Sequence, residues 1–432
     1  MATTPHLQRA LTPLLLWGLG VGYVISGMYF GWNLGLEKGG TLGMAIATLL
    51  VIVLYVSFTL CYAELACAIP KAGGVFDYAT RALGRDWGFL AGLAQVFEFV
   101  LAPPAIAAGI GAHLHLFFPQ LSPLYGALGA YLLFTLLNVL GVKLAATFEL
   151  VITLLAIVGI GLFVILTYPH IQTVRFTQNA LPHGWAGVWA AIPFAIWFFL
   201  GIEGLANAAE ESTHPQRDLT RGFAWAMLTL VLLCGLTFVG AVGVAGWTAA
   251  VFKTDGSATD SPLPLVLSHF LGENGFYWAV VVFGLFGLVA SFHGLLMAAG
   301  RATFEMGRVR LLPAWLGKIQ ERFKTPSNAL FFNMLVGITA LLSNTTADII
   351  VLSVLGALTL YGFGVVSLLA LRRRAPTLVR PFKTPLYPYL PVVSLVLIGI
   401  AFGAVVVSNF TLSLYYLGAL GGAFLLHKVS KK

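Results

Sequence analysis

Residues 185–212 read WAGVWAAIPFAIWFFLGIEGLANAAEES, an apolar run of membrane-crossing length that holds Glu203 between Gly201 and Gly204. An ionised side chain at membrane depth costs about 2.5–3.5 kcal/mol on insertion scales, so it should face a partner, a cavity or a ligand. Glycine weakens a helix, and a broken helix is tolerated in lipid only where its backbone faces protein or a water-filled cavity. The segment therefore predicts a broken membrane helix whose acid binds a cation or an amine.

The composition of the whole chain indicates a membrane protein. Of its 432 residues, 59% are hydrophobic and 9% are charged. The mean hydropathy of +0.91 is far too high for a soluble fold. The apolar runs have the length of about 20 residues that a helix needs to cross a bilayer, and they are too long for barrel strands. We therefore predict an all-α polytopic fold with twelve spans, at residues 12–36, 41–68, 87–117, 122–140, 146–168, 185–210, 221–249, 275–303, 328–343, 347–371, 386–408 and 410–427.

The basic residues are distributed unevenly between the two sides of these spans. If the N-terminus is inside, the loops on that side hold 21 of the 24 Lys and Arg residues, and the other side keeps only Lys38, Arg175 and Lys253. Because cytoplasmic loops collect Lys and Arg, we predict that both termini are cytoplasmic. The net charge of +8 then reflects topology, and no nucleic-acid partner is expected.

A second glycine-interrupted helix lies five spans before the one that carries Glu203. Span 1 contains LWGLGVGYVISGMYFGWNLGL, with a break expected at Ser26-Gly27. Paired interrupted helices at equivalent places in two halves indicate an inverted-repeat transporter whose site lies between them. We predict non-helical backbone at Ser26 to Met28 and at Gly201 to Gly204, facing each other near the bilayer midplane.

Three stretches carry a resemblance to a known family. YAELACAIPKAGGVFDYATRALGRDWGFLAG, at 62–92, resembles the span 2 to span 3 signature of the amino acid–polyamine–organocation (APC) superfamily. FFLGIEGLANAAEESTHPQRDLTRG, at 198–222, is similar to its span 6 signature, and GRATFEMGRVRLLPAWLGKI, at 300–319, to the motif after span 8. The segments ISGMYFGWNLGLEKGG, EFVLAPPAIAAGIGA and ASFHG look most like the bacterial ethanolamine permease branch of that superfamily.

The resemblance implies a LeuT-type 5+5 inverted repeat with two extra C-terminal helices. One transmembrane domain would then cover 1–432, with the two inverted repeats at 12–168 and 185–371 and the last two spans at 386–427. It also implies secondary uptake of a small organic amine, such as ethanolamine, usually coupled to protons, through the bacterial inner membrane. The alternative within transport is an amino-acid permease or exchanger of the same fold.

The span 1 break departs from the pattern of amino-acid carriers. Those carriers usually show Gly-Ser-Gly, whose bare N–H groups bind the substrate carboxylate, whereas this chain has Ile25-Ser26-Gly27. A β-branched residue restricts the backbone approach that glycine allows, which is evidence against a substrate with a carboxylate. Met28 stands where related ethanolamine permeases often have an acid, so a less polar amine could fit.

Two acids lie deep in predicted spans. Glu203 matches the acid of the superfamily's span 6 motif, and Glu98 is the acid of span 3, which lines the cavity in this fold. Each is expected to bind substrate or couple protons, the alternative being a structural brace or a hydrogen-bonded packing acid. The acids expected to pair with arginines of the inner loops are Glu64, Glu210 and Glu211.

Aromatic residues cluster around the two breaks, and an aromatic face attracts an ammonium group within about 6 Å. Those nearest the breaks are Tyr29, Trp32, Trp197, Phe198 and Phe199. Trp197 and Phe198 are favoured for substrate contact, and the alternative, packing or lipid contact, is expected for some of the set. His293 in span 8 is a candidate proton relay or a buried neutral histidine. Ala156 stands where some proton-coupled relatives carry a lysine, so that device is not expected.

We predict a permease that alternates access, and no enzyme. The sequence offers no clustered His/Cys ligands, nucleophile elbow or phosphate-binding loop, so no metal or cofactor is expected. The predicted partners are the amine, a coupling proton and membrane lipid. Proton coupling is assigned to Glu203, Glu98 and His293. The predicted substrate-binding residues are Ser26, Gly27, Met28, Tyr29, Glu98, Trp197, Phe198, Gly201, Ile202 and Glu203.

Overall fold

Helices make up most of the chain that the computed structural model describes, which is residues 10–140, 145–343 and 345–429. Within those ranges the β contacts are three isolated bridges, and ten helices are long and apolar enough to cross a membrane. Two shorter apolar helices, Pro13–Gly22 and Ser327–Ser343, lie where the first and ninth spans were expected. The all-α, multi-pass prediction is confirmed, and the count of twelve spans stays a prediction.

The helices follow one another with short connections. The long ones are α3 (Asn33–Ala68), α5 (Arg85–Phe117), α6 (Pro123–Leu140), α7 (Ala145–Thr167), α10 (Pro215–Ala245), α13 (Gly275–Arg308), α14 (Ser327–Ser343), α15 (Thr346–Arg374), α16 (Tyr389–Ser408) and α17 (Phe410–Val429). The shorter ones are α1 (Pro13–Gly22), α2 (Ser26–Tyr29), α4 (Val75–Leu83), η1 (Tyr168–His170), α8 (Val174–Thr177), α9 (Gly184–Trp197), η2 (Ile202–Glu211), α11 (Trp247–Val251) and α12 (Pro262–Ser268).

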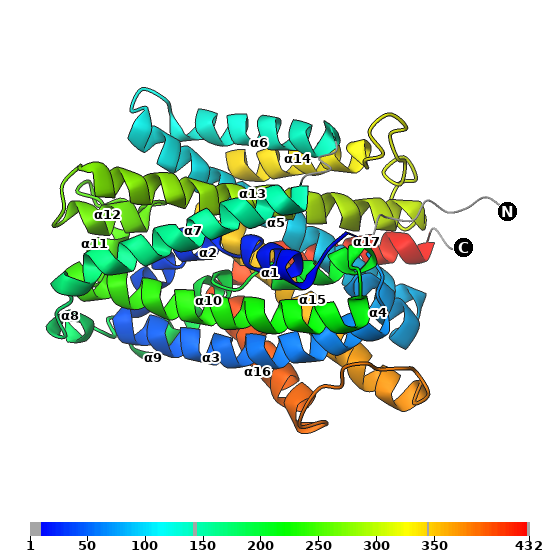
Figure 1. Cartoon of the computed structure of the whole chain (residues 1–432). Helices are drawn as coiled ribbons and strands as arrows, with labels where there is room; N and C mark the ends of the chain where they lie inside the picture. The colour runs from blue at the N-terminus through cyan, green and yellow to red at the C-terminus, as the bar shows by residue number, and fades with distance from the viewer. Residues whose placement is uncertain (1–9, 141–144, 344, 430–432) are drawn as a thin grey trace.

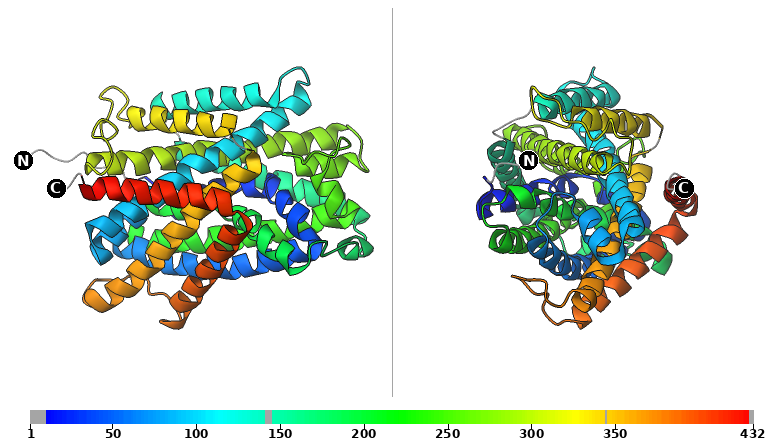
Figure 2. Two further views of the ribbon diagram at one scale, coloured as in Figure 1. Left: turned by 180° about the vertical axis from the view of Figure 1, so that it is seen from behind. Right: turned by 90° about the vertical axis from the view of Figure 1, so that its right-hand side faces the viewer.

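Most helices run along one long axis of the molecule (Figure 1). The start of α1 and the end of α17 lie at the same end of the bundle, which we call the terminal end (Figures 1 and 2). Helices α6 and α14 lie side by side along one edge, while α15 and α16 cross the bundle obliquely (Figure 2). The interrupted segments pack against other helices, α1–α2 against α7, α10 and α13, and α9–η2 against helices that include α3 and α10.

Span 1 is broken in two places, and neither is where the sequence predicted. Turns at residues 23–25 and 30–32 flank α2, so Ser26 to Met28 are helical and that part of the prediction is wrong. The reason is that their N–H groups have partners. Gly27 donates to the Val24 carbonyl at 2.9 Å, and Met28 to that of Ile25 at 3.0 Å.

Span 6 breaks at the predicted glycine. Helix α9 ends at Trp197, a turn follows, and Gly201 adopts a left-handed φ of +104° that favours glycine. The chain then continues as the 3₁₀ helix η2. Of the predicted non-helical stretch, Gly201 to Gly204, only Gly201 lies outside a helix, and the break extends back to residue 198. A Cβ on Gly27 would collide with the Trp197 carbonyl, and one on Gly201 would lie 3.2 Å from the Tyr23 carbonyl. The two breaks therefore pack directly on each other.

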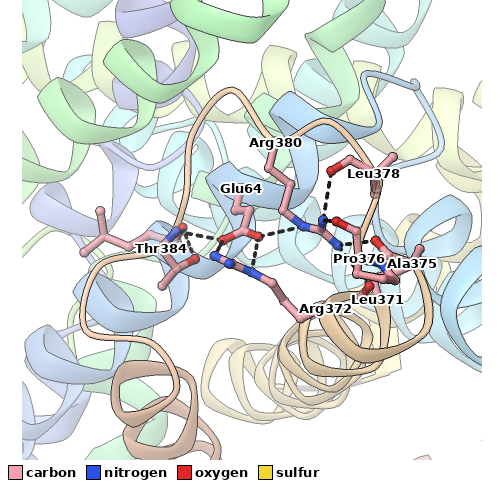
Figure 3. A network of polar contacts seen from close by, with 9 residues as sticks. Glu64, Leu371, Arg372, Ala375, Pro376, Leu378, Arg380 and Thr384 are labelled. Carbon is pink, nitrogen blue, oxygen red and sulfur yellow. Dashed lines mark hydrogen bonds and ion pairs between the residues drawn. The ribbon is translucent and has the colours of Figure 1, made fainter.

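A polar network ties α3 to α15 at the terminal end (Figure 3). Glu64, which is 1% exposed, forms ion pairs with Arg372 at 2.7 Å and Arg380 at 3.2 Å, and accepts from the Thr384 N–H at 2.7 Å. The Arg380 guanidinium also donates to four carbonyls at the end of α15 and in the loop that follows it. Those carbonyls belong to Leu371, Ala375, Pro376 and Leu378.

The expectation that inner acids pair with arginines holds for two of the three residues. Besides Glu64, Glu211 forms an ion pair with Arg301 at 2.5 Å. Glu210 instead accepts a hydrogen bond at 3.1 Å from the backbone N–H of Ala72.

Replacing Glu64 with Gln should lower the stability of the purified protein in detergent. Removing one partner of a buried ion pair typically costs about 3–5 kcal/mol, because the remaining charge stays buried. Glu37→Gln is the matched control, since its pair with Lys38 joins side chains that are 33% and 42% exposed, and such pairs contribute about 0–1 kcal/mol. Thermal unfolding should separate the two variants, and equal small losses would contradict a structural role for the Glu64 network.

Candidate functional site

Two buried carboxyl groups meet beside the span 6 break. Glu203 lies in the first turn of η2 and is 1% exposed, and Glu98 lies in the middle of α5 and is 0% exposed. Their side chains are close enough to each other to interact. The fold thus brings together the two predicted intramembrane acids, which are 105 positions apart in sequence.

A hydrogen bond between two carboxyl groups requires a proton on one of them. As carboxylates, both oxygens of Glu98 would be buried acceptors without a donor, and the two like charges would repel. With one shared proton the pair closes its hydrogen bond and keeps a single negative charge. Neither acid has a Lys, Arg or His within ion-pair distance in the described chain.

Two tyrosines complete this carboxyl pair, and the sequence reasoning missed both. The hydroxyl of Tyr361, on α15, donates to Glu203 Oε2 at 2.9 Å. The hydroxyl of Tyr55, on α3, lies 2.8 Å from that of Tyr361 and donates weakly to the Ile196 carbonyl at 3.5 Å. The other Glu203 oxygen, Oε1, is buried and has no hydrogen-bond partner.

Close backbone packing sets the position of Glu98. A Cβ added to Gly356 of α15 would lie 2.8 Å from the Glu98 nitrogen, so α15 approaches α5 without an intervening side chain. Ser353, one turn earlier, donates to the Glu98 carbonyl at 3.2 Å. Because Tyr361 lies on the same helix, α15 contacts both acids and fixes their positions relative to each other.

The predicted span 1 residues lie at the contact with span 6, but their polar groups are occupied. The Ser26 N–H donates to Ser291 Oγ at 2.9 Å, and the Met28 carbonyl accepts from Trp32 at 3.2 Å. Tyr29 points away from the acids, because its hydroxyl donates to the Ala156 carbonyl at 2.5 Å. Gly27 contacts span 6 through its backbone.

The aromatic wall around Glu203 differs from the predicted one. The Trp197 ring packs edge-on against Phe30 at 5.7 Å, and the Phe198 ring stacks on Trp32 at 5.4 Å, so both rings face span 1. The rings that line the carboxyl side are Tyr361, Tyr55, Phe58 and Phe199, with centroids 4.1–5.4 Å apart. Ile202, between Gly201 and Glu203, is fully buried.

His293 does not join the carboxyl pair. Its Nδ1 lies 3.3 Å from Oε2 of Glu149, an acid of α7 that the sequence reasoning did not single out. The three cysteines are buried and free. No group of three or more His, Cys, Asp or Glu side chains in the described ranges could hold a metal ion.

Comparison with known proteins matches the chain to a permease family and to several membrane transporters. The family model described as amino acid permease matches residues 12–424. The chain is 30% identical over 416 residues to an uncharacterized transporter of Rhizobium meliloti (strain 1021), covering 93% of this chain and 87% of that one. It is 26% identical to the branched-chain amino acid permease BcaP of Bacillus subtilis (strain 168), covering 89% and 85%. It is 27% identical to the methylthioribose transporter of the same organism, covering 90% and 86%.

Tyr361→Phe should destabilise the protein more than a matched tyrosine change elsewhere. It removes the donor to a charged, buried carboxyl, and hydrogen bonds to charged groups contribute about 1.5–3 kcal/mol. Tyr416→Phe is the control, because the buried Tyr416 hydroxyl donates to the neutral Thr359 hydroxyl at 2.8 Å, a bond worth about 0.5–1.5 kcal/mol. Thermal unfolding measures both. A loss for Tyr361→Phe no larger than for the control would contradict its role as the Glu203 donor.

Proposed function

The chain belongs to the amino acid permease family, a family of membrane transporters, and from this premise we propose that it imports a small primary amine, such as ethanolamine, by alternating access. The substrate would bind as a protonated amine between the two broken spans. Glu203 and Glu98 would supply its counter-charge. Within the family, we propose that the chain belongs to the ethanolamine permease branch.

One observation carries the proposal. With one shared proton the carboxyl pair would carry a single buried negative charge, and the ion pairs of the described residues include no cationic side chain that balances it. A protonated primary amine brings one positive charge and three N–H donors. It could therefore balance the charge and reach Glu203 Oε1, the buried acceptor that no protein donor satisfies.

The span 1 backbone supports an amine over an amino acid. A substrate carboxylate needs free N–H groups at the break. Here the N–H groups of Ser26, Gly27 and Met28 already donate to Ser291 Oγ, the Val24 carbonyl and the Ile25 carbonyl. An α-amino acid would have to displace these bonds, whereas an amine without a carboxylate would not.

The runner-up function is amino-acid transport by the same fold. It is favoured by the relative named as a branched-chain amino acid permease, which covers 89% of this chain. In that case the bonds at Ser26 and Gly27 would have to open when substrate enters.

The remaining parts of the proposal concern topology and coupling. We place both termini in the cytoplasm and the chain in the bacterial inner membrane, with 12–168 and 185–371 as inverted repeats. The Glu211–Arg301 ion pair would then close the cytoplasmic side and break when the site opens inward. Uptake would be coupled to protons.

Small primary amines should outcompete their α-amino-acid counterparts for uptake. The test is inhibition of radiolabelled ethanolamine uptake into proteoliposomes by primary amines and by amino acids of matched side-chain size. Equal or stronger inhibition by the zwitterions would favour the runner-up.

Glu203→Gln should weaken amine binding about tenfold to a hundredfold, because a lost charge-assisted hydrogen bond is worth about 1.5–3 kcal/mol. Equilibrium binding of labelled ethanolamine to purified protein measures this. Glu273→Gln, in an exposed loop, removes the same charge far from the site and should bind normally. Normal affinity and normal accumulation in the Glu203 variant would reduce this residue to a structural brace.

A further inference from the structure

A second buried ionisable pair lies outside the carboxyl pair. Glu149 of α7 and His293 of α13 are 1% and 4% exposed, and Glu149 Oε2 lies 3.3 Å from His293 Nδ1. The rings of Phe134 and Phe148 stand edge-on to the imidazole at 6.2 and 6.0 Å. The second Glu149 oxygen, Oε1, is buried and has no donor.

This pair packs on Gly22, the last residue of α1, directly before the first break in span 1. A Cβ on Gly22 would lie 2.6 Å from Glu149 Oε1 and 2.7 Å from Thr153 Oγ1, so only a glycine backbone fits there. Ser291, two residues before His293, donates to the Gly22 carbonyl at 2.7 Å and accepts from Ser26. Helices α7 and α13 thus contact the span 1 break through polar groups centred on Glu149.

The charge of the pair depends on one proton. With Glu149 ionised and His293 neutral, a full negative charge would be buried beside apolar rings, which is costly. One added proton gives either a neutral acid hydrogen-bonded to a neutral imidazole or a carboxylate–imidazolium ion pair. Both forms have zero net charge. The buried packing of the pair on span 1 is therefore favoured when the pair holds a proton.

Few other charged groups face this pair. Tyr23, at the break, lies between Glu149 and the Arg301–Glu211 ion pair, and its hydroxyl experiences all three charges. Arg301 is on the same helix as His293, and Glu211 ends η2. Because Arg301 is engaged by Glu211 at 2.5 Å, it does not neutralise Glu149 directly.

We propose that Glu149 and His293 form a proton-binding site, and that the proton imported with the substrate is carried there. This deepens the proposed transport function and rests on it. The pair takes a proton from water when it is open to one side of the membrane. The proton stabilises the packing of the span 1 break on α7 and α13, and it returns to water when the site opens to the other side. Loss of the proton leaves a buried charge that favours hydration, so proton occupancy biases the conformational equilibrium.

The first test uses proteoliposomes with Glu149→Gln, which keeps the shape but cannot exchange a proton. Wild-type protein under an inward gradient of about one pH unit should accumulate ethanolamine about tenfold per coupled proton. The variant should exchange internal for external ethanolamine but should not accumulate it above equilibrium. Glu273→Gln is the control and should accumulate normally. If wild-type protein moves leucine rather than ethanolamine, the amine proposal fails and the same comparison proceeds with leucine.

A second test needs no substrate. On this proposal the folded pair holds a proton at neutral pH, whereas in the unfolded chain ordinary Glu and His side chains, with pKa values of about 4.3 and 6.5, have largely lost theirs. The folded state then binds more protons, so stability should fall as pH rises. Glu149→Gln should reduce this slope by about one proton relative to wild type, measured by thermal unfolding between about pH 7 and about pH 9.

The outcomes separate the possibilities. An unchanged slope together with normal pH-driven accumulation in Glu149→Gln would overturn the proposal and leave the pair as a structural contact. Accumulation that follows a sodium gradient and ignores the pH gradient would also overturn it. His293→Gln provides a second variant, expected to lose coupling in the same way, in case Glu149→Gln does not fold.

Discussion

A charge placed in the middle of a membrane bundle must be balanced, and this requirement organises the centre of the molecule. Glu203 can lie there because span 6 stops being an α-helix at Gly201, whose φ is +104°. The acid meets Glu98 from α5 and a hydroxyl donor from α15. With one proton shared between them, the two acids would keep one negative charge. Burial of that charge is unfavourable until a cation arrives, which is what a binding site for a cation needs.

On the proposed function, the broken helices also limit which substrates can bind. Span 1 is interrupted twice, yet its central N–H groups are all used by carbonyls or by Ser291. The carboxyl pair still offers acceptors for a cation, because Oε1 of Glu203 and both carboxyl oxygens of Glu98 are buried without a hydrogen-bond partner. Transport then requires that the packing of span 1 on its neighbours change, and Glu149 and His293 lie at that contact.

The sequence was sufficient for the features set by composition and by single residues. Apolar runs predicted the multi-pass helical fold, the signature stretches predicted the family, and the glycine at Gly201 predicted the span 6 break. The span 1 break was misplaced, because helicity at Ser26 depends on a partner from span 8. Tyr361 could not be found without the fold, since nothing marks one tyrosine in an apolar span. Glu149 could have been found by the criterion applied to Glu203, an acid inside a predicted span.

The most direct test of the central claim is a cryo-EM structure of the protein saturated with ethanolamine or with the primary amine that stabilises it most. The account predicts an ammonium nitrogen within hydrogen-bond distance of Glu203 Oε1, about 2.7–3.2 Å, between the span 1 and span 6 breaks. The Tyr361 bond to Glu203 should remain in place. An amine bound away from the Glu98–Glu203 pair, with that pair still closed on itself, would contradict the account.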